Sequence, residues 1–408
     1  MGPKRHGTAT TSTLARVNQT AIIEALRGSG ALSRQQIGTK TGLSPATVNR
    51  LTASLLEEGV VVNAGFEPSR GGRPSVLLRY SGGSRLVAAL QLHGEGASGV
   101  LVDLDGKIVV RRDTDFAGPG SGSGSTPSEH ASPDVPDSLA RTGELLDALI
   151  GTAASMGTPC LAVGVAVPGV VREPRGGVVR MPELQWDGVE VGSYLRERVQ
   201  LPVVVENDAN ALAFGELHRG AGKGLSSLVA LVLENGLGSG IVTNGQLHRG
   251  AHGEAGEIGY LLMDRSSFER SYSDMGDLED RIGSAALTRT ARERGIAVSG
   301  KTELSAQDVF ERARRGDSTA EELASEILDM VAMAVAAIVI TLDPQLVVVG
   351  SNFVGSAETV IPGIQKRLTG RIMTVPPLIA ATHGTDAVLL GAAELAANEV
   401  NDFAYFAY

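Results

Sequence analysis

The sequence predicts an α/β body preceded by a small head in which short helices are followed by two strands. From about residue 86 onward, apolar runs of strand length alternate with amphipathic helical stretches, a pattern typical of sheets covered by helices. Glycine is abundant, at 52 of 408 residues, and aromatic residues make up 4 %, which suits many tight strand-to-helix turns. We therefore expect a head at residues 1–80 and a body at residues 81–408.

Charge is distributed unevenly along the chain. The whole sequence has a net charge of −10, yet residues 1–85 hold 11 Lys and Arg against 4 Asp and Glu. The remainder holds 25 against 42. A basic head on an acidic body is typical of a local site for a polyanion such as DNA.

Two further observations concern compartment and metal. The longest apolar stretch, residues 330–342, is shorter than the roughly 20 residues that span a bilayer, and no signal sequence is evident. We expect a cytoplasmic protein with no membrane partner. The single cysteine, Cys160, excludes an intramolecular disulfide and a multi-thiolate zinc site.

Helix signals organise the head. Apolar residues from Leu14 and Val17 to Leu26 recur at helical spacing before two glycines end the first helix. Ser33-Arg34-Gln35-Gln36 has the pattern of a capping box and predicts a short second helix. A glycine turn follows, and Ser44-Pro45 predicts the start of a third helix.

Two helices separated by a tight turn predict a helix-turn-helix, whose second helix enters the major groove by its amino end. Val48, Leu51 and Leu55 lie on one face of that helix, which we expect to be buried. The predicted DNA-contacting residues of the third helix are Ser44, Ala46, Thr47, Asn49 and Arg50. Where the second helix crosses the phosphates, the predicted contacts are Ser33, Arg34 and Gln35.

A wing is expected after the third helix. Short apolar runs at residues 60–63 and 75–78 flank the tip Arg70-Gly71-Gly72-Arg73-Pro74, which predicts a β-hairpin. Arg70 and Arg73 are predicted to lie in a minor groove. The alternatives are that these arginines are only solvent-exposed, or that the head is a protein-contact module.

The body begins as a meander, followed by a Gly-, Ser- and Pro-rich stretch at about residues 118–136 that predicts a disordered loop. A helix is expected at residues 138–151, and the C-terminal third is mostly helical. The predicted strands are 86–92, 99–104, 108–111, 161–167, 202–206, 228–233, 240–243 and 346–350.

Three motifs of the body, taken with the head, resemble the ROK family (repressors, open reading frames and sugar kinases). They are Pro168-Gly169, Glu206-Asn207-Asp208-Ala209-Asn210 and Gly253-Glu-Ala-Gly-Glu257-Ile-Gly-Tyr260. The likeness extends over about residues 12 to 400 and is to the repressor branch, because the kinases lack such a head. It implies an actin-like (ribonuclease H-like) two-lobed ATPase fold and a homodimer or tetramer on a palindromic operator.

The resemblance also implies ligand-binding residues. Asn207 and Asp208 would hydrogen-bond sugar hydroxyls, and the family's kinases use this Asp as general base. Glu257 and Glu279 match two further sugar-contacting carboxylates, and Tyr260 stands where the family has a histidine that serves sugar and zinc. The alternative for Asn207 and Asp208 is an Asx turn that caps the next helix, and each glutamate alone fits a solvated surface acid.

The parts that a kinase needs are altered. A phosphate-cradling Asp-x-Gly-Gly-Thr turn of the kinases falls on Gln91-Leu92-His93-Gly94-Glu95, and a Gly-Thr-Gly turn on Glu234-Asn235-Gly236. Acidic side chains there oppose phosphate binding. Arg270, Tyr272 and Asp277 replace the thiolates of the family's zinc loop. We therefore expect no catalytic residues, no cofactor and no metal, with Arg270 pairing with Asp274, Asp277 or Glu279.

The sequence thus predicts a DNA-binding transcriptional regulator, a repressor of carbohydrate uptake or metabolism genes, with an effector in a degenerate kinase-like cleft. The first alternative is an active sugar kinase with an appended DNA-binding head. The second is a DNA-binding regulator that no ligand controls.

Overall fold

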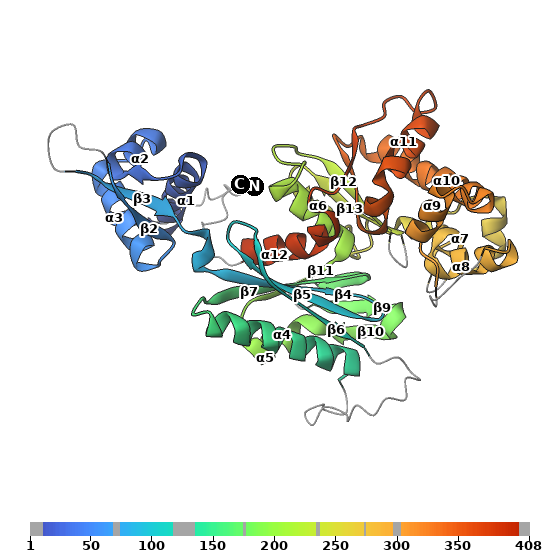
Figure 1. Cartoon of the computed structure of the whole chain (residues 1–408), viewed down its shortest axis with the longest axis horizontal. Coiled ribbons are helices and arrows are strands. Elements are labelled where there is room, and N and C mark those ends of the chain that lie inside the picture. Colours follow the sequence, from blue (N-terminus) through green and yellow to red (C-terminus); the bar gives the residue numbers. More distant parts are fainter. Residues whose placement is uncertain are drawn as a thin grey trace, which may run out of the picture.

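The computed structural model describes residues 11–67, 74–116, 135–173, 177–233, 237–272, 275–296 and 303–399. A head ends at Tyr80 and leads into a body built on two five-stranded sheets (Figure 1). The α/β body and the winged helical head predicted from the sequence are therefore both present. The predicted loop at 118–136 lies outside the described residues as far as 134.

The head packs three helices on a three-stranded antiparallel sheet of order β1-β3-β2. Ile22, Ile23 and Leu26 form the buried face of the first helix, whereas Val17, which belongs to the same helical spacing, is 60 % exposed. The head elements are α1 (Thr11–Ser29), β1 (Leu32–Ser33), α2 (Arg34–Thr41), α3 (Pro45–Glu57), β2 (Val61–Phe66) and β3 (Val76–Tyr80).

The first lobe follows a short 3-10 turn, η1 (Gly82–Ser84). A second, small antiparallel sheet, β10-β9-β8, was missed from the sequence because its strands are short and lack a clear alternation. The elements are β4 (Leu86–Leu92), β5 (Gly96–Asp103), β6 (Ile108–Asp115), α4 (Asp137–Ser155), β7 (Cys160–Val167), β8 (Val170–Glu173), β9 (Val178–Met181), η2 (Pro182–Leu184), β10 (Trp186–Glu190), α5 (Val191–Val199), β11 (Val203–Asn207) and α6 (Asp208–Arg219).

The second lobe holds the other five-stranded sheet and most of the C-terminal helices. Its elements are β12 (Leu228–Leu233), β13 (Leu237–Thr243), β14 (Gln246–Leu247), η3 (Ile258–Tyr260), η4 (Arg265–Glu269), α7 (Glu279–Ile282), α8 (Ser284–Glu293), α9 (Ala306–Arg314), α10 (Ser318–Leu342), β15 (Val347–Val349), η5 (Ser351–Ser356), α11 (Ala357–Leu368), β16 (Leu378–Ala380), η6 (Gly384–Asp386) and α12 (Ala387–Glu399).

The two large sheets have the same topology. Their orders are β11-β7-β4-β5-β6 and β14-β13-β12-β15-β16. In each, the first strand along the chain is central. On one side of it the second strand is antiparallel to the first and the third is antiparallel to the second. On the other side the fourth and fifth strands run parallel to the first. The body is therefore a duplicated α/β unit, as the resemblance implied.

The central strand of each sheet is buried on both faces, as its largely apolar sequence requires. In β4, Val87 and Ala89 face one core while Leu86, Ala88 and Leu90 face another. The residues of β12 divide in the same way between two cores. One shared core thus lies between the sheets and joins that of the head, and each lobe has a second core on its outer face.

Helices α6 and α12 fill the space between the sheets, and α4 and α5 cover the opposite face of the first sheet (Figure 1). The two inner helices touch at Gly215 and Gly391, where a Cβ on Gly391 would lie 1.9 Å from the carbonyl oxygen of Ala211. Only glycine permits so close an approach. Helix α10 is long and apolar enough to cross a membrane, but 56 % of its most apolar window is buried in the protein.

Candidate nucleic-acid interface and ligand site

Helix α2 begins at the capping box and ends at the glycine turn that the sequence predicted. The Ser33 hydroxyl accepts a hydrogen bond from the Gln36 N–H at 3.4 Å, and the Gln36 side chain accepts one from the Ser33 N–H at 2.8 Å. This reciprocal pair is the predicted capping box. The helix ends at Gly42, which adopts φ 70° and leads directly into the turn before α3.

Helix α3 begins as predicted. Ser44 is its N-cap and accepts a hydrogen bond from the Thr47 N–H at 3.2 Å, with Pro45 in the first turn. The two hydroxyls of Ser44 and Thr47 also lie 2.9 Å apart. The amino end of α3 is thus fixed, and two hydroxyls lie at the end that a major groove would receive.

The two faces of α3 differ in burial. Val48, Leu51 and Leu55 are at most 2 % exposed and pack in the head core. Asn49 and Arg50 are exposed, and so is Ala46 in the first turn. The structure therefore presents to solvent the amide and the guanidinium that suit adenine and guanine edges.

Two of the three residues predicted at the phosphates make contacts within the head. Ser33 is 2 % exposed and its hydroxyl serves the cap, so its side chain presents little surface to DNA. The Arg34 Nε donates to the Thr52 hydroxyl at 2.9 Å, which ties α2 to α3. Gln35 is exposed.

The wing is the β2–β3 hairpin. Its strands pair antiparallel from Val61 opposite Tyr80 to Phe66 opposite Val76. The tip that carries Arg70 and Arg73 lies outside the described residues.

In the body, Asn207 is the N-cap of α6. Its Oδ1 accepts from the N–H groups of Ala209 at 2.9 Å and Asn210 at 3.1 Å, and its amide donates to the Gly169 carbonyl at 3.2 Å. Asp208 is 5 % exposed, and its Oδ1 also accepts from Ala209 at 2.7 Å. The Asx cap that the sequence left open is therefore formed, and it brings the Pro168-Gly169 motif to this pair.

Glu206 has a partner that sequence analysis missed. Its buried Oε2 accepts from Arg249 Nε at 2.7 Å and Nη2 at 2.6 Å, and its Oε1 accepts from the Asn207 N–H and the Asn210 amide. A buried carboxylate requires such partners. Because the Arg249 carbonyl accepts from the Ala255 N–H at 3.1 Å, the pair joins the end of β11 to the Gly253–Tyr260 motif.

Glu279 and Tyr260 lie together in the second lobe. A Cβ at Gly259 would stand 2.8 Å from the Glu279 carboxyl carbon. The two oxygens of Glu279 accept from the N–H groups of Leu237 at 3.2 Å and Gly276 at 3.1 Å. Burial raises the pKa of Glu279, and these two hydrogen bonds offset part of that rise. Tyr260 is 39 % exposed.

The candidate ligand segments meet around the first residues of β13. Besides the Leu237–Glu279 contact, the Ser239 N–H donates to the Gly256 carbonyl at 2.9 Å, next to Glu257 in the chain. On the other face, a Cβ at Gly240 would lie 2.0 Å from the carbonyl oxygen of Ala209, in the first turn of α6. One strand end thus borders both clusters of polar side chains.

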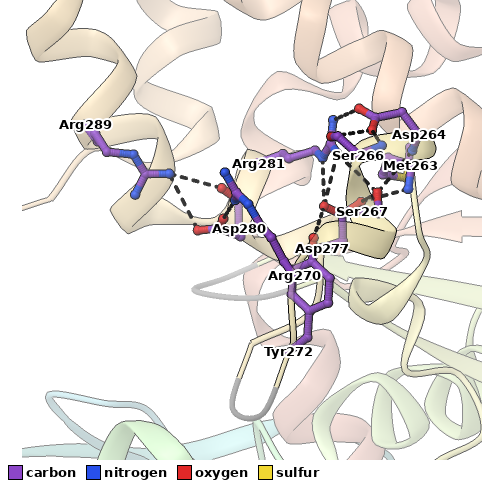
Figure 2. A network of polar contacts seen from close by, with 10 residues as sticks. All are labelled: Met263, Asp264, Ser266, Ser267, Arg270, Tyr272, Asp277, Asp280, Arg281 and Arg289. Carbon is purple, nitrogen blue, oxygen red and sulfur yellow. Dashed lines mark hydrogen bonds and ion pairs between the residues drawn. The ribbon is translucent and has the colours of Figure 1, made fainter.

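A polar network holds the segment that corresponds to the family's zinc loop (Figure 2). The buried Asp277 carboxylate accepts from the Met263 N–H, the Ser267 hydroxyl and the Tyr272 hydroxyl, each at 2.7 Å, and from Arg281 at 3.1 Å. Burial alone would raise the pKa of Asp277, but these hydrogen bonds outweigh it and lower the pKa to about 2.

The arginine in this network is not the one expected. Arg270 Nη1 pairs with Asp280 at 3.0 Å, so its expected pairing with Asp277 or Glu279 is wrong, and Asp274 lies outside the described residues. Arg281 also reaches Asp264, at 2.7 Å. Arg281 stands four residues after Asp277, a helical pair spacing that was the available sequence signal. With Asp277 already bonded to four groups, these residues do not fit a zinc ion.

The first phosphate turn of the kinases is here the β4–β5 hairpin. Gln91 is 5 % exposed in β4, and the exposed Glu95 stands at the turn, with its carbonyl accepting from the Phe116 N–H at 2.7 Å. The second turn, Glu234-Asn235-Gly236, lies outside the described residues.

Comparison with known proteins agrees with both halves of this architecture. Residues 89–399 match the model of the ROK family, and residues 17–62 match a winged helix-turn-helix DNA-binding domain. The chain therefore belongs to the ROK family. Because it also carries this head, it is a DNA-binding transcriptional regulator.

Individual relatives fall into two groups. The xylose repressor of Caldicellulosiruptor bescii is 26 % identical over 83 % of this chain and 84 % of its own length. The glucokinase of Streptomyces coelicolor is 31 % identical, over 60 % of this chain and 82 % of its own length. A solved ROK family transcriptional regulator, a homologue of the E. coli Mlc protein, shares the fold with a TM-score of 0.73 at 20 % identity, over 96 % of this chain and 97 % of its own.

Proposed function

We propose that this protein is a sugar-responsive repressor that releases its operator when a sugar binds in the body. The observation that carries the proposal is the pair of polar clusters at the start of β13, Asn207 and Asp208 on one side and Glu257, Tyr260 and Glu279 on the other. Carboxylates and amides are suited to polyol hydroxyls. Full-length likeness to xylose repressors supports a pentose or a related sugar as the ligand.

On the DNA side, Asn49 and Arg50 recognise bases, with Ser44, Ala46 and Thr47 beside them in the groove. Arg34 and Gln35 contact phosphates, Ser33 supports that contact as the cap of α2, and Arg70 and Arg73 reach the minor groove. Two copies of the chain bind one operator in the cytoplasm. A duplex selected from a random pool should then contain an inverted repeat, with half-sites about 10 base pairs apart or a multiple of that.

In this proposal the body binds sugar without phosphorylating it. Gln91 and Glu95 occupy the turn that cradles phosphate in the kinases, and an exposed carboxylate there repels a nucleotide. The glucokinase likeness covers 60 % of this chain, against 83 % for a xylose repressor, so it supports the repressor less well.

Thermal unfolding with a panel of sugars tests the ligand assignment. D-xylose, D-glucose and N-acetylglucosamine are compared on the wild type and on Asp208→Asn, with Asp147→Asn on the surface of α4 as control. A ligand at 100 times its Kd stabilises the folded state by about 2.7 kcal/mol, which raises Tm by several degrees. We expect one sugar to do so in the wild type and the control but not in Asp208→Asn.

The rival functions give other results. A coupled assay with Mg-ATP and the same sugars that produced ADP would identify a kinase. No stabilisation by any sugar, with DNA binding intact, would identify a regulator that works without a ligand.

A further inference from the structure

Helix α6 connects the candidate ligand site to the DNA-binding head. Its first turn carries Asn207 and Asp208, and its last residue is Arg219. Twelve residues of α-helix are about 18 Å long. A displacement at one end of such a rigid element is carried to the other.

At its far end α6 meets the head through one carbonyl group. The Leu104 carbonyl, in the turn between β5 and β6, accepts from Arg27 Nη2 at 2.8 Å and from Arg219 Nη2 at 3.3 Å. Arg27 stands in the last turn of α1, within the head. Leu104 itself is fully buried, so the head and the body share an acceptor inside the protein.

The surroundings of this carbonyl are closely packed. The Arg27 guanidinium lies 5.0 Å from the ring centroid of Tyr80, the last residue of the wing, and 3.4 Å from Asp105. A Cβ on Gly82, in the linker, would fall 1.9 Å from the Asp105 carboxylate. The Gly82 carbonyl also accepts from the Leu104 N–H at 3.1 Å. The linker, the head and the β5–β6 turn therefore cannot move independently.

The same end of α6 is tied to both lobes. Arg219 pairs with the buried Glu394 of α12, which lies on the first sheet. Glu216 accepts from the Thr382 N–H at 2.6 Å and from its hydroxyl at 2.7 Å, beyond β16 in the second lobe. A shift of the lobes against each other therefore acts on Arg219.

We propose that this junction, formed by Arg27, Tyr80, Leu104, Asp105, Arg219 and Glu394, couples the ligand site to the head. When α6 moves with the lobes, Arg219 changes its hold on the Leu104 carbonyl, and Arg27 transmits the change to α1. Arg27 and Arg219 are positioning residues, which act on DNA and ligand through other groups. The sugar half of the proposal rests on the proposed function, whereas the coupling itself is reciprocal and can be tested from the DNA side.

Hydrogen–deuterium exchange of the full chain, with and without a duplex selected on the wild type, tests the coupling without any sugar. We expect the duplex to change exchange in residues 208–222 of the wild type. Arg27→Gln should still bind the duplex within a few-fold and should lose this distant change, and Arg27→Lys should restore part of it. The control Arg198→Gln, which breaks a surface pair with Asp147, should behave as wild type.

Arg219→Gln adds a second test, but it leaves Glu394 buried without its partner and can unfold the chain. Arg27→Gln leaves only the half-exposed Asp105 carboxylate without its ion-pair partner. This variant should therefore stay folded, and its exchange pattern remains informative. No change in residues 208–222 of the wild type, or the full change in Arg27→Gln, overturns the proposal.

The sugar side has its own measurement. We expect D-xylose to weaken duplex binding by about fivefold or more in the wild type. In Arg27→Gln this ratio of duplex affinities without and with D-xylose should fall towards one, while the Kd for D-xylose stays the same. An unchanged ratio would also overturn the coupling. If D-xylose does not bind, the ligand assignment fails, and the exchange experiment still decides the coupling.

Discussion

The two lobes of the body share one strand order and differ in what surrounds it. The first lobe adds the small β10-β9-β8 sheet and meets the head at the β5–β6 turn. The second adds the segment of residues 258–293 and the long helix α10 on its outer face. The shared part forms the inner core and, through the β5–β6 turn, α6 and α12, also the body's side of the junction. The Arg281 network lies in the segment added to the second lobe. The duplicated sheet thus fixes the fold, and each lobe has contacts that the other lacks.

Each lobe has one close contact between an inner helix and a strand next to the central strand, on the parallel side in the first lobe and on the antiparallel side in the second. A Cβ on Gly164 of β7 would lie 2.0 Å from the Ala392 carbonyl of α12, and a Cβ on Gly240 of β13 would lie 2.0 Å from the Ala209 carbonyl of α6. In both lobes a strand glycine allows the inner helix to approach the sheet. These two close contacts lead to the largest expected effect.

Gly164→Ala and Gly240→Ala should each destabilise the protein by about 3 kcal/mol, because neither backbone carbonyl can move away. Gly151→Ala in helix α4 is the matched control, since its Cβ meets nothing within 4 Å. The control should be stabilised by up to about 1 kcal/mol. Urea unfolding measures all three. A large effect at Gly164 and none at Gly240 would show that the close approach of helix and strand is required in the first lobe alone.

The Arg281 network should give a smaller effect, confined to the second lobe. Arg281→Met leaves the buried Asp277 carboxylate without its cation but with three other donors, so we expect a loss of about 2 kcal/mol. Arg289→Met, which breaks an exposed pair with Asp280, should cost less than about 1 kcal/mol. Equal losses in the two variants would mean that the Arg281 network adds nothing beyond a surface pair.

Substitutions on the exposed face of α3 should weaken DNA binding without changing the stability of the protein or its response to sugar. Asn49→Ala and Arg50→Ala should each weaken binding of the selected duplex about tenfold, or about 1.4 kcal/mol, and relax base preference. Their Tm and their response to sugar should match the wild type, because both side chains are exposed. Gel-shift titration checks the affinity. Unchanged affinity in both variants would remove α3 from base recognition.

A further effect concerns acid stability. The folded-state pKa of Asp277, about 2, lies below the ordinary value of about 3.9 for an unfolded chain. Asp277 therefore contributes stability that is fully present above about pH 4 and is lost as the pH falls towards 2. Asp277→Asn should flatten this part of the curve of unfolding free energy against pH. Parallel curves for the variant and the wild type would contradict the assignment.

Local signals in the sequence predicted much of the fold. The capping box at Ser33 and the N-cap at Ser44 depend on neighbours along the chain, and they placed α2 and α3 correctly. The strands 86–92 and 228–233 agree with β4 and β12, because a short, almost wholly apolar run between turn residues has few other structures. The spacing did not predict which apolar residues of α1 are covered, since tertiary packing selects the buried face of a helix: Val17 is exposed, whereas Ile22 and Ile23 are buried.

The site was harder to predict, because its contacts join distant segments. The pairing of Glu206 with Arg249 and the shared carbonyl of Leu104 bring together residues 43 to 115 positions apart. No spacing rule reveals such pairs. The resemblance supplied Asn207, Asp208 and Glu279, and the structure adds that Asn207 caps a helix and Glu279 binds two backbone N–H groups.

The most direct test of a regulator that senses sugar with a kinase-like body is fluorescence anisotropy on the selected duplex. The wild type is titrated alone, with D-xylose, and with D-xylose and Mg-ATP, while ADP is followed in the same samples. We predict that D-xylose weakens duplex binding at least about fivefold, that Mg-ATP adds nothing, and that no ADP appears. Duplex binding that ignores D-xylose, together with steady formation of ADP, would contradict the account.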